Sequence, residues 1–205
     1  VIAAWKLVLK FLDQTVLHLD LDLVPVTFKT LDIICADFLA QFPAKLLAEL
    51  IRTIGRYADG SRDDPRGHVD VNTSITAVGL LWKVADFTAK DLPLLSALVD
   101  DLVLSTWREL LIELTRHCVH PLSEVRTASL HTLFGVLTTH AGLIHRTLRE
   151  GPLYSEYLLP LLSHVHETQL KVYRSGTSGG TVPASSGLMQ HHSRNSELKQ
   201  WNETL

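Results

Sequence analysis

The stretch that decides the fold is PLSEVRTASLHTLFGVL, residues 121–137. After Pro121, small and apolar residues recur three or four positions apart, a spacing that places them on one face of a helix. Ser123 is in position to cap the N-terminus of this helix, and Glu124 is a residue favoured in the first turn. The stretch therefore predicts an amphipathic helix over residues 123–140.

The same spacing extends outward from this helix through nearly everything before residue 175. The predicted helices cover residues 3–19, 27–42, 43–58, 73–90, 93–104, 106–120, 123–140 and 153–173. Pro43 and Pro93 stand at helix starts, and Pro160 predicts a kink or a break in the last helix. No stretch shows a convincing strand pattern. The chain is therefore predicted to be all-α, with about eight helices.

Short connections between these helices favour antiparallel neighbours, which bury their apolar faces by stacking. Pro121, Val125, Arg126 and Leu133 fit the proline, Val-Arg and spaced apolar positions typical of HEAT repeats. We therefore predict a HEAT/armadillo-like, right-handed helical-repeat solenoid over residues 1–174.

The remaining residues divide into two parts by composition. Residues 175–190 are predicted to form a flexible Gly/Ser-rich loop. Residues 191–205 are predicted to begin a further repeat helix, with Leu198, Trp201 and Leu205 on one face.

Composition narrows the classes of function. The 205 residues are 46% hydrophobic and carry a net charge of −3, which argues against nucleic acid as a main ligand. Charged residues interrupt every apolar stretch, so no membrane span is predicted. Cys35 and Cys118 lie within apolar helical patterns and are predicted to be buried thiols in a reducing compartment. Because the chain begins without methionine and stops within a helical pattern, we expect a piece of a longer protein.

No catalytic, cofactor-binding or metal-binding residue is predicted. Residues 176–180, GTSGG, match G-x-S-x-G, but a nucleophile elbow needs a strand before the serine and a helix after it. The adjacent His191 and His192 point about 100° apart on a helix, and no ligand set completes a site there. His117 and His120 have helical spacing, but His117 is predicted to be solvated or to cap its helix.

Six residues are predicted to have structural roles: Asn72, Trp82, Asp86, Pro121, Arg126 and Trp201. Asn72 is the expected cap of the helix over residues 73–90. For Asp86 we prefer a hydrogen bond to the cap of a neighbouring helix over a functional site. Arg126 is expected to pair with acidic residues, as in ladders along stacked repeats.

Four separated stretches carry a resemblance to a known family. They are residues 30–58, 71–87, 118–143 and 191–205, and in this order they resemble the Mon-two (also called Ysl-two) family. The matches include Gly79-Leu80-Leu81-Trp82, Val125-Arg126, His140, and Lys199-Gln200-Trp201. After ADFTAKD the chain departs from the family pattern, because it continues directly to LPLLSALVDDL where members can carry a longer, charged insertion.

The resemblance implies a C-terminal-half fragment of a large Golgi and endosomal scaffold. Such proteins are similar to the large Sec7-type Arf exchange factors but lack the Sec7 domain, so no enzyme activity and no nucleotide exchange are expected. Implied partners are a Dopey-family protein, a phospholipid-flippase complex and Arf-like GTPases. The implied role is endosome-to-Golgi transport on the cytoplasmic face of the trans-Golgi network and endosomes, with peripheral membrane association through partners.

The alternative function is direct binding to an acidic membrane surface. It requires a basic patch or an amphipathic helix with a lysine-rich polar face. Lys6, Lys10, Arg52 and Arg56 are dispersed among acidic residues in the sequence. We therefore rank membrane binding second.

Overall fold

The computed structural model describes residues 1–17, 22–60, 70–91, 99–148 and 153–167. Within these ranges all regular secondary structure is helical, so the all-α prediction is confirmed for the part of the chain that the structure describes. Trp201, His191, His192 and the predicted parts 175–190 and 191–205 lie outside the described residues.

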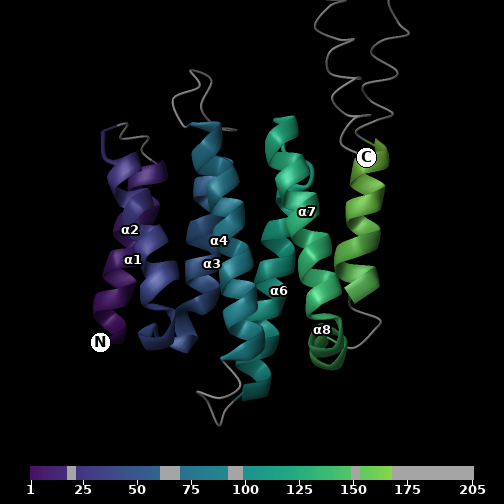
Figure 1. Cartoon of the computed structure of the whole chain (residues 1–205), viewed down its shortest axis with the longest axis horizontal. Helices are drawn as coiled ribbons and strands as arrows, with labels where there is room; N and C mark the ends of the chain where they lie inside the picture. Colours follow the sequence, from purple (N-terminus) through teal and green to yellow (C-terminus); the bar gives the residue numbers. More distant parts are fainter. Residues whose placement is uncertain (18–21, 61–69, 92–98, 149–152, 168–205) are drawn as a thin grey trace, which may run out of the picture.

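The longer helices stand side by side in chain order, from the purple N-terminal helix to the green C-terminal one (Figure 1). The elements are α1 Ile2–Leu17, α2 Val24–Asp37, η1 Leu39–Gln41, η2 Ala44–Leu46, α3 Leu47–Asp59, α4 Val71–Lys90, α6 Val99–His117, α7 Ser123–Thr139, α8 Ala141–Leu148 and the π-helical η3 Leu153–Leu158. The backbone stays helical after η3 as far as residue 167.

The contacts between helices define two layers. One layer contains α1, α3 and α6, and the other contains α2, α4 and α7, with successive members of each layer packed together. Contacts α1–α2, α3–α4 and α6–α7 join the layers into helical pairs. The described chain is therefore a row in which each pair stacks on the previous one.

The apolar core runs through this row and is densest at the central pair. Leu47, Leu50, Ile51 and Ile54 of α3 recur at the helical spacing that predicts one buried face, and all four are fully buried, as is Trp107 of α6. Each such side chain contributes about 1.5–3 kcal/mol relative to its exposed state. Stacking of the helical pairs therefore buries apolar side chains that a single pair would leave exposed.

One predicted helix boundary is wrong. The sequence predicts separate helices over residues 93–104 and 106–120, whereas α6 runs without interruption through this boundary. The hydroxyls of Ser105 and Thr106 donate to the Leu102 carbonyl at 2.9 and 2.8 Å. Because these hydrogen bonds close within the helix, the two polar residues do not end it.

The short helix α8 is absent from the sequence-based prediction. In Figure 1 it lies below α7 and runs across the direction of the long helices. His140 ends α7 by donating its N–H to Val136, and its carbonyl then accepts from the N–H groups of Leu143 and Ile144 at 3.0 Å each. One residue thus both ends α7 and starts α8, and Gly142 in the first turn of α8 is the glycine nearest to this change.

Two predicted caps are also wrong. Helix α4 begins at Val71, and the carboxylate of Asp70 accepts from the Asn72 N–H at 3.1 Å, so Asp70 is the cap. Asn72 lies in the first turn, and its side-chain amide donates to the same carboxylate at 3.1 Å. At α7 the cap position is Leu122, and the Ser123 hydroxyl donates to Glu124 instead, at 2.9 Å.

The last helix continues through Pro160 without the predicted break. The six residues of η3 form a π-helical turn just before Pro160. Proline cannot donate a backbone hydrogen bond, and such local widening is one way a helix accommodates it. No described helix combines the length and the apolar character that crossing a membrane requires.

Candidate binding surface

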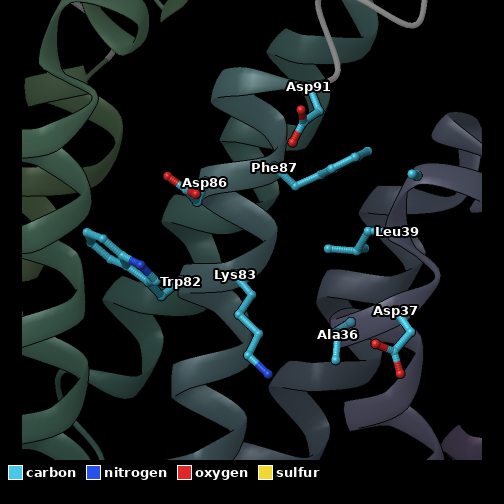
Figure 2. A pocket seen from close by; sticks show the side chains of 10 residues that line it. Ala36, Asp37, Leu39, Trp82, Lys83, Asp86, Phe87 and Asp91 are labelled. Atoms are coloured by element: carbon cyan, nitrogen blue, oxygen red, sulfur yellow. The ribbon is translucent and has the colours of Figure 1, made fainter.

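An open groove of about 680 Å³ lies between the end of α2 and the second half of α4. Its α2 side consists of Cys35, Ala36, Asp37, Leu39 and Ala40, and its α4 side consists of Trp82, Lys83, Asp86, Phe87 and Asp91. Figure 2 shows Phe87 reaching from α4 toward the side that carries Leu39. Apolar and charged groups therefore share the same groove.

The groove carries an excess of negative charge. Lys83 Nζ lies 3.1 Å from Asp32 Oδ1, an ion pair that joins α4 to α2. Asp37 and Asp91 are exposed, and no described residue forms an ion pair with either. Asp37 is the last residue of α2 and Asp91 is the C-cap of α4, positions where the helix dipole adds negative potential. The groove therefore suits a partner with positive charge.

The thiol beside this groove is not a reactive group. Cys35 is buried, and burial raises the pKa of its thiol to about 12. Burial raises the pKa of the Cys118 thiol to about 12 as well. Both residues are free and buried, as the sequence predicts, and neither provides the thiolate that nucleophilic chemistry needs.

Trp82 and Asp86 belong to the packing of α4 against α7. Figure 2 shows both side chains turned away from the α2 side of the groove. The Trp82 and His140 ring centroids lie 6.1 Å apart, and Asp86 Oδ1 lies 3.6 Å from His140 Nε2 and 2.7 Å from Lys90 Nζ. His140 is the C-cap of α7, so Asp86 does approach the cap residue of a neighbouring helix, but the 3.6 Å separation is too long for the hydrogen bond that the sequence predicts.

The environment of His140 favours its neutral form. Burial lowers the pKa of His140, and the Asp86 carboxylate opposes this only in part. The ring also lies 5.9 Å from the buried Trp107 ring, centroid to centroid. This cluster is therefore an interface between α4, α6 and α7.

Gly135 is a packing residue that sequence reasoning missed. A Cβ atom at this position would lie 2.8 Å from Cζ3 of Trp82. The absence of a side chain lets the indole cover the α7 backbone. The sequence signal, a glycine within a strongly helical pattern, is weak without a structure.

Arg126 and Pro121 together hold the turn between α6 and α7. The Arg126 side chain is buried, and its Nη1 donates to the carbonyls of His120 at 2.9 Å and Pro121 at 2.7 Å. We expected acidic partners, whereas these bonds go to the backbone. The His120 carbonyl is buried and needs a donor, and the guanidinium provides one to it and one to the partly buried Pro121 carbonyl.

The prediction that His117 is solvated is wrong. Its ring is fully buried at the interface of α3 and α6, with Nδ1 3.2 Å from Asp59 and Nε2 3.5 Å from Glu113. Arg116 Nη2 lies 2.7 Å from each of the same two carboxylates. We call Asp59, Glu113, Arg116 and His117 the charged cluster. Residue spacing does not reveal this cluster, because Asp59 is distant along the chain from the other three residues.

The charged cluster favours the protonated form of His117. Burial alone lowers its pKa, but the interactions of its ring N–H groups with the carboxylates of Asp59 and Glu113 outweigh burial and raise the pKa above its usual value. Within the described ranges, no group of three or more His, Cys, Asp or Glu residues is placed to hold a metal ion. The charged cluster therefore links α3 to α6 through ionic contacts.

Comparison with known proteins identifies the family. A model of the C-terminal region of the Mon2 protein matches residues 93–205, which is more than half of the chain. The chain belongs to the Mon2 family. The family resemblance seen in residues 30–58 and 71–87 extends beyond the part that this model covers.

Curated Mon2 relatives match most of the chain. Protein MON2 homolog of Drosophila melanogaster is 26% identical over 98% of this chain and 12% of its own length. Monensin-resistant homolog 2 of Caenorhabditis elegans is 28% identical over 90% of this chain and 10% of its own length. The Protein MON2 homolog of Homo sapiens is 24% identical over 89% of this chain and 11% of its own length. The chain thus spans about a tenth of these relatives, and no solved structure matches it significantly.

Proposed function

We propose that this Mon2-family chain is a non-catalytic scaffold segment that offers a protein-binding surface for endosome-to-Golgi transport. Its stacked helical pairs support a HEAT/armadillo-like, right-handed solenoid as the architecture. Stacked repeats present long, rigid surfaces, which suits scaffolding. The proposed location is the cytoplasmic face of the trans-Golgi network and endosomes.

The observation that carries this proposal is the open groove between α2 and α4. It combines the apolar side chains of Leu39 and Phe87 with the carboxylates of Asp37 and Asp91. Apolar contacts provide affinity and charges provide selectivity for a partner. Because these carboxylates repel acidic headgroups, the groove favours a protein over a membrane surface.

The proposed partners are those that the family resemblance implies. A Dopey-family protein is the first candidate, and a phospholipid-flippase complex and Arf-like GTPases are further candidates. In this proposal membrane association is peripheral and follows from partner binding.

The proposal is tested by a pull-down of a purified Dopey-family protein with the chain and two variants. Ala36→Arg places a long side chain in the groove from an exposed position. Thr139→Arg places the same group on an exposed position of α7 that does not line the groove. We expect Ala36→Arg to weaken binding at least about ten-fold, about 1.4 kcal/mol, and Thr139→Arg to leave it unchanged.

Circular dichroism of each variant shows whether its helices are intact. If the wild-type chain is folded but does not bind, the Dopey-family protein is not a partner of this segment. Equal binding by both variants removes the groove as the binding site.

A further inference from the structure

The outer face of the first helical pair is apolar and uncovered by any described element. Leu7 and Phe11 of α1 are 68% and 54% exposed, and Val26 and Ile33 of α2 are 62% and 42% exposed. Helix α1 packs on α2 and α3, and α2 packs on α1 and α4. Figure 1 shows this pair at the N-terminal end of the row. The other described helices of the row therefore leave these four side chains uncovered.

Three lysines flank these apolar residues. Lys6 and Lys10 lie beside Leu7 and Phe11 on α1, and Lys29 lies between Val26 and Ile33 on α2. All three lysines are exposed, and no described residue forms an ion pair with them. We call the four apolar residues and three lysines the N-terminal face.

The carboxylates of the same pair do not neutralise these lysines. Asp13 pairs with Arg56 of α3, and Asp32 pairs with Lys83 of α4. Asp37 lines the groove with α4. Asp22, just before α2, is the remaining described acid of this pair. The N-terminal face therefore has a net positive charge beside an apolar surface.

Ion pairs between successive helical pairs follow a common direction. The earlier pair supplies the acid and the later pair supplies the cation in Asp13–Arg56, in Asp32–Lys83 at 3.1 Å and in Asp59–Arg116 at 2.7 Å. The opposite direction occurs in Arg52–Glu109, the longest of these contacts at 3.8 Å. In this arrangement the N-terminal face is the cationic half of an interface whose acidic half lies on its partner.

We propose that the N-terminal face binds an amphipathic helix, alone or in a helical pair, whose flanks carry acidic residues. Its apolar stripe covers Leu7, Phe11, Val26 and Ile33, and its carboxylates pair with the lysines. Helix-on-helix burial provides affinity, and the charges fix the choice of partner. This deepens the proposed scaffold function by naming a second surface and the chemistry of its partner.

The test uses fluorescence anisotropy with the whole chain and two labelled helical peptides. Both peptides carry the same leucine stripe, flanked by glutamates in one and by lysines in the other. We expect the glutamate peptide to bind at least about ten-fold more tightly, with a smaller difference at high salt. The double variant Lys6→Glu, Lys10→Glu is expected to reverse the preference, an outcome that a folding defect does not produce.

A matched pair of variants tests the apolar part. Phe11→Asp is expected to weaken binding of the glutamate peptide at least about ten-fold. Phe134→Asp changes a similarly exposed phenylalanine of α7 and is expected to leave binding unchanged. Equal affinity for both peptides, or no binding of either by the folded chain, overturns the proposal.

Two other occupants are distinguished by parallel measurements. If the chain co-sediments with acidic vesicles, Phe11→Asp abolishes this, and the two peptides bind equally, the N-terminal face binds lipid. Dimerisation in sedimentation velocity that the same variant abolishes assigns it to a second copy. Either result overturns the proposal. Because no trafficking protein is present in these assays, their failure leaves the Dopey-family pull-down to be judged separately.

Discussion

At the scale of single residues, two glycines on neighbouring helices have opposite surroundings. Gly135 of α7 lies under the Trp82 ring, and an added Cβ would approach Cζ3 to 2.8 Å. Gly79 of α4 is exposed, and an added Cβ would meet nothing within 4 Å. The same substitution at the two positions therefore separates helix propensity from packing.

We expect Gly79→Ala to stabilise the chain by up to about 1 kcal/mol, because alanine restricts the unfolded backbone and favours the helix. We expect Gly135→Ala to destabilise it by about 1–3 kcal/mol despite this gain, because Trp82 must move. Urea unfolding followed by circular dichroism measures both. Stabilisation of similar size by both substitutions would contradict the packing role of Gly135.

At the scale of elements, the connections determine how the helices meet. Between α6 and α7, the buried guanidinium of Arg126 satisfies two turn carbonyls, and the His120 ring accepts from the Leu122 N–H at 3.1 Å. Between α7 and α8, the backbone of His140 serves both helices. Side chains and backbone within a few residues thus fix each change of direction.

Arg126→Ala is expected to destabilise the chain by about 3 kcal/mol, because it leaves the buried His120 carbonyl without this donor and opens a cavity. Arg146→Ala is the control, because Arg146 is exposed and bonds only one turn back, Nε to the Gly142 carbonyl at 3.0 Å. We expect the control to change stability by less than about 0.5 kcal/mol. Equal, small losses measured by urea unfolding would refute the role of Arg126 in the turn.

At the scale of the whole molecule, stability depends on interfaces between successive helical pairs. The charged cluster joins α3 to α6 through His117, whose pKa is raised in the folded chain. A raised folded pKa means that the folded state holds the proton more tightly than the unfolded state. The stabilisation is therefore complete below the ordinary histidine pKa and is lost as pH rises through the higher folded value.

We expect the free energy of unfolding to fall as pH rises from about 6.5, the ordinary histidine pKa. His117→Gln is expected to remove this fall, whereas His131→Gln, at an exposed position, is expected to retain it. Urea unfolding at successive pH values measures the effect. His140 has the opposite sign, because its lowered pKa makes acidification below the ordinary value destabilising. An unchanged pH profile in His117→Gln would exclude the charged cluster as its cause.

The sequence predicted much of the fold because helical periodicity is local. The buried positions of α3 and the two buried cysteines agree with the apolar spacing. Val8 is an exception, because it lies one turn from the buried Leu12, a spacing that predicts one shared face, and yet is 37% exposed. Helices α2 and α3 make the main contacts with α1. Part of the apolar surface of α1 therefore stays exposed. Periodicity shows that one face of a helix is apolar, but it does not show how much of that face the neighbouring helices cover.

The candidate surface was predictable only in part. Trp82 and Asp86 could be singled out on one helix face, but their meeting with His140 joins α4 to the end of α7. The groove between α2 and α4 depends on where two helices end, and helix ends are the least certain product of sequence patterns.

By itself, the sequence determined an all-helical chain, its buried stripes and its resemblance to the Mon2 family, because these follow from local spacing and residue identity. Only the tertiary structure decided that His117 is buried, that Arg126 serves the turn backbone and that the N-terminal face stays open. The burial of His117 and the exposure of the N-terminal face depend on which distant helices stack together, whereas the Arg126 hydrogen bonds depend on the path of the backbone through the turn. Burial and charge pairing act across space, so they become visible only when the stacked pairs bring those residues together.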